Sequence, residues 1–299
     1  MEANGVQFLI DNNGNRVFIP SKTFYDSCCE FDYGGESTIF TCIIAGRKYV
    51  LKKFRPGREK QFYIKKLRKI QIMQRLPNYT GFTNIVCPVK ENENDNLISA
   101  YLMEPIFTSL IKKLDQLFPG RDLWSIRFQL LIKVCEIVEW AHKNGIYIGD
   151  LNENNFLLDA NHNYEPINVD RDNHGIIDPQ NGKYYGFDSF PSLVEEAIVK
   201  YSPCDLKVHS IYDYLSAVDI ELLTLMIMRI LTTEMSWNST LTTEEVSCRL
   251  DKLQNTGQIL SSEREILEVI LSDSVDKPYP IHILKQLNKR NAKLDPFIL

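Results

Sequence analysis

The sequence has seven cysteines but no CxxC pair and no Cys/His spacing typical of a zinc site. Cys28 and Cys29 are adjacent and are poor disulfide partners for each other, and the total is odd in a long chain. These features argue against a disulfide framework and predict buried thiols in a reducing compartment. The cysteines are at positions 28, 29, 42, 87, 135, 204 and 248.

The chain also lacks the features of a membrane-bound, secreted or nucleic-acid-binding protein. No basic, apolar and small-residue signal opens it. The longest apolar helix, expected around residues 215–232, carries Asp219, Glu221 and Arg229, which predicts a buried core helix and not a membrane span. The formal net charge of −5 argues against a dedicated nucleic-acid binder. We expect a cytoplasmic protein, with delivery into another cell as an effector as the alternative.

Repeats and low-complexity segments are absent, and the composition is that of an ordinary globular protein. A chain of 299 residues can form one large domain or two lobes that share a cleft. Charge is unevenly distributed, because residues 47–75 are strongly basic and contain a single acid, Glu59.

The first hundred residues predict a small β-rich lobe. The Asn-Gly between the apolar runs 6–10 and 16–19 is the signature of a tight hairpin. Pro105 cannot continue a ladder, so we expect the chain to leave the sheet there. Further strands are expected from about residue 25 to 33 and at 39–44, 48–54, 84–90 and 97–106, and a helix with its apolar face at 63, 64, 67, 70, 73 and 76 is expected at 58–76.

Two features of this lobe are typical of phosphate binding. Gly34 and Gly35 form a turn between strands, and such a turn lets a backbone approach phosphates closely, although most Gly-Gly turns are simple hairpins. Alternation places Lys52 and Lys53 on opposite strand faces, and Lys52 is the better candidate because hydrophobic residues precede it at 50 and 51. A solvated edge lysine is the alternative. Glu59 either favours the helix N-terminus or holds Lys52 in place.

The second part of the chain is predicted to be mainly helical. A long helix capped by Asp122 should end at Asn144 and Gly145. Capping-box patterns, Thr242 with Glu245 and Ser262 with Glu265, open two further helices. A short helix is also expected at 107–115, an ordered loop at 173–202, a buried helix at 214–235 and a last helix near 280–290.

Residues 146–172 carry the strongest chemical signal. An apolar strand leads into Asp150, and Asn155 follows five residues later. A second strand, a turn and a third strand ending in Asp170 come next. This order places a carboxylate, an amide and a second carboxylate where they can surround a phosphate and its metal.

These parts resemble, in this order, the protein-kinase superfamily across residues 25–295, and most of all divergent bacterial members with a GGEG-type loop and a GDxNxxN segment. The corresponding runs here are GGESTIF at 34–40 and GDLNENN at 149–155, with YVLKKF as the lysine strand and AYLMEP as the hinge. The run SAVDIELLTLMIMRI is similar to the core helix of the large lobe. The resemblance implies a two-lobed α+β fold, with a hairpin extension at 1–24 packed on the small lobe, a β-rich lobe at 25–104 and a mainly helical lobe at 105–299.

The resemblance also implies roles for residues of the large lobe. Asp150 would be the catalytic aspartate, which orients the acceptor hydroxyl and takes its proton. Asn155 and Asp170 would hold Mg²⁺, with Mn²⁺ as the alternative metal. Asp219 would tie the core helix to the catalytic loop.

In the small lobe, the resemblance implies that Lys52 pairs with the α- and β-phosphates of ATP and that Glu59 anchors Lys52. The turn formed by Gly34, Gly35 and Ser37 would cover the phosphates. Backbone groups of Glu104 and Ile106 would contact adenine.

Three departures from the common kinase pattern stand out. Ile148-Gly149-Asp150 replaces HRD, which argues against regulation through a catalytic-loop arginine, and Asn152 replaces the usual loop lysine. Asp170-Arg171-Asp172 replaces DFG. Because residues i and i+2 of an extended strand point the same way, Asp172 is expected as a second metal ligand or as the principal one.

The sequence therefore predicts an enzyme that transfers the γ-phosphate of ATP to a protein serine or threonine hydroxyl. Two alternatives stay open. One is a small-molecule kinase of the aminoglycoside-phosphotransferase type, which also uses a GDL-x-x-x-N segment. The other is a pseudokinase that acts as a binding scaffold, which the altered glycine loop and the DRD run favour.

Overall fold

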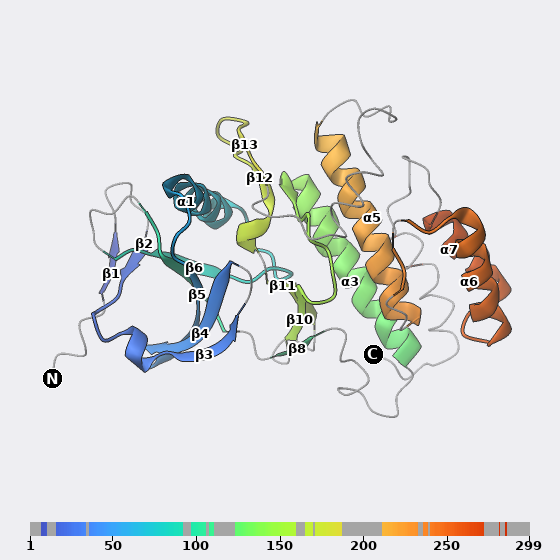
Figure 1. Cartoon of the computed structure of the whole chain (residues 1–299), viewed down its shortest axis with the longest axis horizontal. Coiled ribbons are helices and arrows are strands. Elements are labelled where there is room, and N and C mark those ends of the chain that lie inside the picture. Colours follow the sequence, from blue (N-terminus) through green and yellow to red (C-terminus); the bar gives the residue numbers. More distant parts are fainter. Residues whose placement is uncertain are drawn as a thin grey trace. The chain divides into compact units, whose positions relative to one another are not determined.

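The computed structural model shows a mixed α+β protein with a mainly β N-terminal region (Figure 1). The chain divides into two compact units, residues 1–107 with 180–185, and residues 108–179 with 186–299. The structure describes residues 7–10, 16–33, 36–91, 97–105, 108–110, 123–159, 165–169, 171–186, 211–232, 236–238 and 240–271, together with Ile281 and Lys285.

The first unit is built on a seven-stranded sheet of order β1-β2-β6-β7-β5-β4-β3. The predicted hairpin is confirmed, because β1 and β2 pair antiparallel, and it joins the sheet edge through a parallel pairing of β2 with β6. Ala45 and Gly46, with φ of 48° and 77°, connect β4 and β5, so the turn expected over Ala45, Gly46 and Arg47 is one residue shorter and Arg47 belongs to β5. The strands are β1 (Gln7–Ile10), β2 (Arg16–Ile19), β3 (Cys29–Tyr33), β4 (Ser37–Ile44), β5 (Arg47–Phe54), β6 (Ile85–Val89) and β7 (Ala100–Met103).

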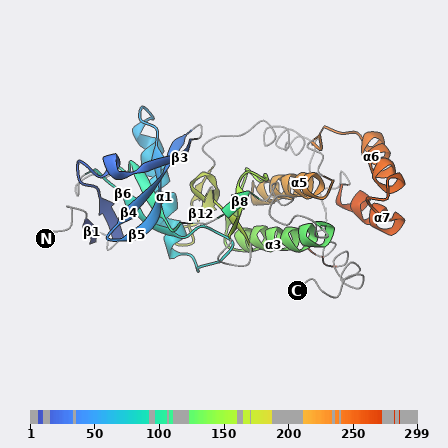
Figure 2. The same cartoon turned by 90° about the horizontal axis from the view of Figure 1, so that it is seen from below.

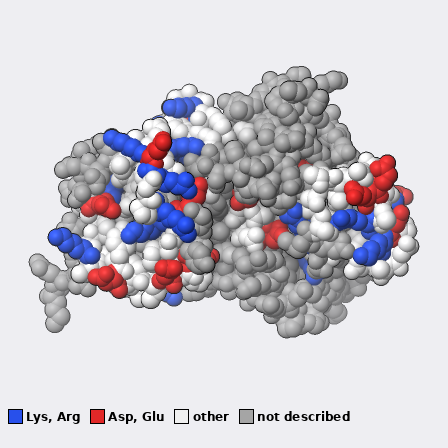
Figure 3. Space-filling view, viewed as in Figure 1, with Lys and Arg blue, Asp and Glu red and all other residues white. Residues whose placement is uncertain are grey.

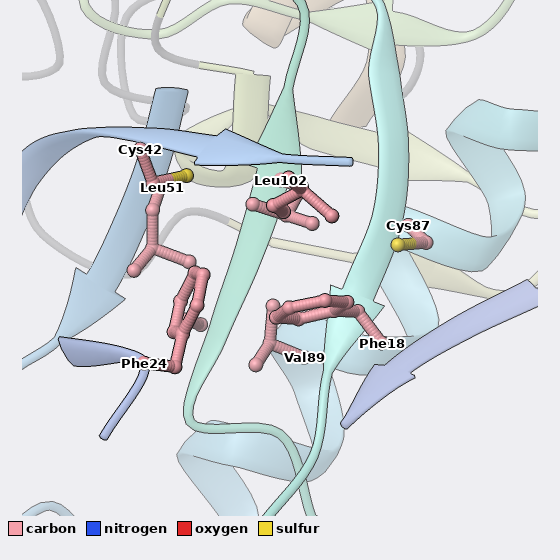
Figure 4. Packing of buried hydrophobic residues seen from close by; sticks show 9 residues of the cluster. Phe18, Phe24, Cys42, Leu51, Cys87, Val89 and Leu102 are labelled. Carbon is pink, nitrogen blue, oxygen red and sulfur yellow. The ribbon is translucent and has the colours of Figure 1, made fainter. Parts of the chain in front are cut away.

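The core of this unit lies on one face of the sheet. Phe18, Phe24 and Leu51 pack there with residues of β4, β6 and β7 (Figure 4). The strand expected from Tyr25 is wrong at its start, because Tyr25–Ser27 form a 3₁₀ turn and β3 begins at Cys29. The Ser27 hydroxyl donates to the Phe24 carbonyl at 2.7 Å, and such local bonds compete with strand pairing.

The helix expected at 58–76 is present as α1 (Lys60–Arg75), and its predicted apolar face is buried only in part, at Ile70 and Met73. Ile64 is 37% exposed, while Lys66 and Lys69 are fully buried. They lie three residues apart on the face that also buries Ile70 and Met73, so the inward face of α1 is part apolar and part cationic.

The second unit contains two long helices, α3 (Leu123–Lys143) and α5 (Ile211–Thr232), which lie side by side (Figures 1 and 2). The prediction of a buried core helix is confirmed, because every α5 residue from 221 to 232 is buried. The Arg229 guanidinium is satisfied there by the carbonyl of Trp237, to which its Nε donates at 2.9 Å. The helix end expected at Asn144 and Gly145 is confirmed, because α3 ends at Lys143 and Gly145 has a φ of +69°.

Two shorter helices, α6 (Thr243–Asn255) and α7 (Ser261–Ile270), pack on each other. The capping box of Thr242 and Glu245 is confirmed in both hydrogen bonds. The second predicted box is wrong, because α7 begins at Ser261 and Ser262 therefore lies inside the helix. The helix expected near 280–290 lies outside the described residues except for Ile281 and Lys285.

Short strands complete the second unit. The predicted strand pair after Asp150 is confirmed as β10 (Phe156–Asp159) and β11 (Glu165–Asn168), and β9 (Ile146–Tyr147) pairs with β12 (Gly175–Ile177). The helix expected at 107–115 is wrong at β8 (Thr108–Leu110), because these residues pair with β10. The loop expected at 173–202 contains β12 and, in the first unit, β13 (Tyr184–Tyr185).

Among the described cysteines, Cys42, Cys87 and Cys135 are buried thiols, as predicted. Cys29 and Cys248 are exposed, so the prediction is wrong for these two. In the described part of the chain, none of the helices is both long and apolar enough to cross a membrane.

Candidate functional site

The Asp150 carboxylate is held between two side-chain amides of its own loop. Asn152 Nδ2 donates to Asp150 Oδ1 at 2.6 Å, and Asn155 Nδ2 donates to Asp150 Oδ2 at 2.9 Å. The Asn155 amide also donates to the Asp150 carbonyl at 2.9 Å, and Asn152 Oδ1 accepts the Asn154 backbone N–H at 2.9 Å. Because each carboxylate oxygen has its own donor, the direction in which Asp150 points is fixed.

The loop is anchored to α5 by Asp219, as predicted. This fully buried carboxylate accepts the backbone N–H groups of Ile148 and Gly149, each at 2.7 Å. The Nε2 atom of His142 on α3 lies 2.8 Å from Asp219 Oδ2. Gly149 has a φ of +69°, a conformation that a side chain would strain. Asp219 therefore holds the backbone of Gly149, and the absence of a Cβ allows Gly149 to adopt this positive φ.

Asn155 also ties the loop to the end of the strand pair, since its carbonyl accepts the Val169 N–H at 3.1 Å. Its amide nitrogen is used toward Asp150, which leaves the Asn155 Oδ1 oxygen as the atom that could face a cation. Asp170, the next predicted ligand along the chain, lies outside the described residues.

Asp172 does not lie on an extended strand, so the expectation of an i, i+2 arrangement with Asp170 is wrong. The strand β11 ends at Asn168, and Arg171–Asn173 form a 3₁₀ turn in which successive residues advance by about a third of a turn. Asp172 is fully buried. Within the described residues, no group of three or more His, Cys, Asp and Glu side chains could hold a metal ion.

The sequence did not predict three buried polar residues close to Asp150 and Asp172 in the chain. His174 Nε2 lies 3.0 Å from Asn168 Oδ1, and both residues are buried. Glu153, inside the GDLNENN run, is only 2% exposed. Asn168 and His174 lie outside the GDLNENN and DRD runs. Glu153 lies inside GDLNENN, at a position to which the kinase resemblance assigns no role.

In the first unit, Lys52 lies on β5 between β4 and β7, opposite Ile39 and Tyr101. It is 7% exposed, which agrees with the choice of Lys52 as the inward lysine. Lys53 is on the other face, where its ammonium lies 3.7 Å from the centre of the Tyr25 ring. The role of Lys52 toward phosphate remains a prediction.

The predicted hinge directly follows the strand beside the lysine strand, since Met103 on β7 pairs with Val50 on β5. The Glu104 N–H donates to the Asn84 carbonyl at 3.0 Å, so its own carbonyl is the backbone group that remains for a ligand. Ile106 lies outside the described residues.

Ser37 begins β4, is buried and pairs with Phe54, while Gly34 and Gly35 lie outside the described residues. Glu59 is the exposed N-cap of α1, and its side chain makes no cap hydrogen bond. Lys66 of α1 forms an ion pair with Glu36, the residue before β4, at 3.2 Å. The pairing of Glu59 with Lys52 remains a prediction.

The candidate residues are therefore assembled in two sets, each within its own unit. Ser37, Lys52 and Glu104 belong to the first unit, and Asp150 with Asn155 belongs to the second. No protein-family model and no curated protein matches the chain.

Proposed function

We propose that this chain is an ATP-dependent phosphotransferase that acts on serine or threonine hydroxyls of a protein. The observation that supports the proposal most is the Asp150 carboxylate, which two loop amides hold in one direction. An aspartate that orients an acceptor hydroxyl and takes its proton needs such positioning. The order of lysine strand, helix and hinge strand before it supports the same class, as does the resemblance to protein kinases.

In the proposed reaction, the acceptor hydroxyl gives its proton to Asp150, and its oxygen forms a bond to the γ-phosphorus. The bond between the γ-phosphorus and the bridging oxygen breaks, so that ADP leaves. Lys52 holds the α- and β-phosphates, and the anchored loop keeps Asp150 in place. Catalysis is then mainly positioning and electrostatic stabilisation.

The residues present fit a magnesium ion in part. Asn155 offers its Oδ1 oxygen, and Asp170, with Asp172 as the alternative, would supply a carboxylate. When bound, Mg²⁺ neutralises charge on the β- and γ-phosphate oxygens. Mn²⁺ prefers similar oxygen ligands and is the alternative.

The first prediction tests this function. Purified protein with Mg-ATP should label protein or peptide hydroxyls with the γ-phosphate, and Asp150→Ala should slow the transfer about 100-fold or more, because the proton acceptor is removed. Glu244→Ala, at an exposed acid of α6, is the matched control and should keep the wild-type rate. Equal rates for Asp150→Ala and wild type would reject the proposal.

The same assay separates the alternatives. A small hydroxylated acceptor preferred over all proteins would indicate a small-molecule kinase. No transfer, together with no Mg-dependent thermal stabilisation by ATP, would indicate a binding scaffold, since any ligand that binds only the folded state raises the melting temperature.

A further inference from the structure

Lys66 differs from the surface cations of its own helix. Lys and Arg side chains are spread over the surface of the first unit (Figure 3), and Lys60 at the start of α1 is exposed. The Lys66 side chain is 0% exposed, and its ammonium lies 3.2 Å from Glu36 Oε2. Lysine is almost never fully buried unless a partner compensates its charge. The α1 sequence alone gives no reason for a buried lysine at this position.

The partner places Lys66 beside the start of β4. Glu36 directly precedes β4, and its carbonyl accepts the Arg55 N–H at 2.9 Å, which holds Glu36 against the end of β5. The Lys66 ammonium also lies 5.7 Å from the ring centre of Phe54. Phe54 and Lys52 are two residues apart on β5 and share a strand face, so Lys66 approaches the face that carries Lys52.

We infer that Lys66 is a second phosphate-binding lysine of this unit. Glu36 pairs with its ammonium in the structure. A phosphate oxygen of a bound nucleoside triphosphate takes the place of Glu36, whose side chain is 14% exposed and can turn to water. The exchange is one charge-assisted hydrogen bond for another, so the buried ammonium keeps a partner throughout. This inference rests on the proposed ATP site and assigns α1 a direct part in it.

The test compares two ligands that differ only in their phosphates. Lys66→Met keeps an unbranched side chain, one atom shorter, and removes its charge. By calorimetry it should bind Mg-ATP about 10- to 100-fold more weakly than wild type, with adenosine affinity unchanged, because adenosine has no phosphate for Lys66 to reach. Lys60→Met, on the exposed part of the same helix, should change neither affinity. An equal loss for both ligands, or no loss for ATP, would overturn the inference.

A second variant covers the outcome in which Lys66→Met does not fold. Glu36→Gln removes the same ion pair but keeps the lysine, so Mg-ATP affinity should stay at or above the wild-type value. If Glu36→Gln instead weakens Mg-ATP binding about 10-fold or more, the pair is structural only and the inference is wrong.

Inorganic triphosphate separates the inference from the proposed function. Lys66-dependent binding of triphosphate without binding of ATP would keep the phosphate site and reject the ATP enzyme. Binding of ATP that does not depend on Lys66 would keep the enzyme and reject the phosphate site. Binding of neither ligand would reject both.

Discussion

Asp219 shows how much one residue can organise when it is buried. Its two oxygens take the N–H groups of Ile148 and Gly149, and the His142 ring reaches the same carboxylate. Two backbone donors that precede the proposed catalytic aspartate therefore depend on a single side chain of α5. A donor that loses its partner in a buried site keeps the full cost of its desolvation.

The second prediction concerns this carboxylate. Asp219→Asn leaves one acceptor oxygen, so one N–H group loses its partner, and the free energy of unfolding should fall by about 1–3 kcal/mol. Hydrogen exchange of the Ile148 and Gly149 amides should become faster in the variant, which mass spectrometry can measure. Asp213→Asn, at an exposed position of the same helix, should leave the exchange of these two amides unchanged. Unchanged exchange in Asp219→Asn would contradict the anchoring role.

The contrast between Asp219 and Lys66 shows what the sequence could predict at this scale. An acid inside an apolar helix has to find a partner, so periodicity and the motif together point to Asp219. A lysine on an amphipathic helix has an ordinary explanation as a solvated residue. Its partner Glu36 lies 30 residues earlier in the chain, and only the fold brings the two together.

At the scale of elements, helix ends were predicted where the cap chemistry is local. The Thr242 hydroxyl accepts the Glu245 N–H at 3.2 Å, and the Glu245 carboxylate accepts the Thr242 N–H at 2.8 Å. All of these groups lie within four residues, so the pattern can be recognised directly. By contrast, Thr108–Leu110 form a strand because β10 pairs with them, and no local signal encodes that pairing.

The third prediction tests the cap. Thr242→Ala removes the side-chain acceptor of the first turn of α6 and should lower the free energy of unfolding by about 1 kcal/mol. Denaturant titration measures the difference. Thr243→Ala, at the next and equally exposed residue, removes a hydroxyl without removing the cap and should have a much smaller effect. Similar losses in the two variants would mean that the capping box does not stabilise the helix.

At the scale of the whole molecule, buried thiols link stability to alkaline pH. Burial raises the pKa of Cys42 and of Cys87 from an ordinary 9.0 to about 12 in each case. The unfolded chain releases these protons near the ordinary pKa, whereas the folded protein retains them. Above pH 9 the unfolded state therefore binds fewer protons, and stability falls as the pH rises until the folded thiols ionise near pH 12.

The fourth prediction follows from this fall in stability with rising pH. Each buried thiol should subtract about 1.4 kcal/mol from the free energy of unfolding for every pH unit within this window. Cys87→Ala should be less stable than wild type at neutral pH, because it leaves a cavity, but should lose stability less steeply between about pH 9 and 11. Cys248→Ala, at an exposed thiol, should keep the wild-type slope. Parallel slopes for Cys87→Ala and wild type would contradict the assignment.

The hairpin of β1 and β2 covers the edge of an inner strand of the sheet. β6 would be the outer strand of the sheet if β2 did not pair with it, and Phe18 contributes both to that pairing, through its carbonyl and the Lys90 N–H at 3.0 Å, and to the core. An uncovered strand edge is a template on which a second chain can add a strand. The hairpin therefore covers the edge of β6, and any process that detaches it would expose that edge and open the core at Phe18.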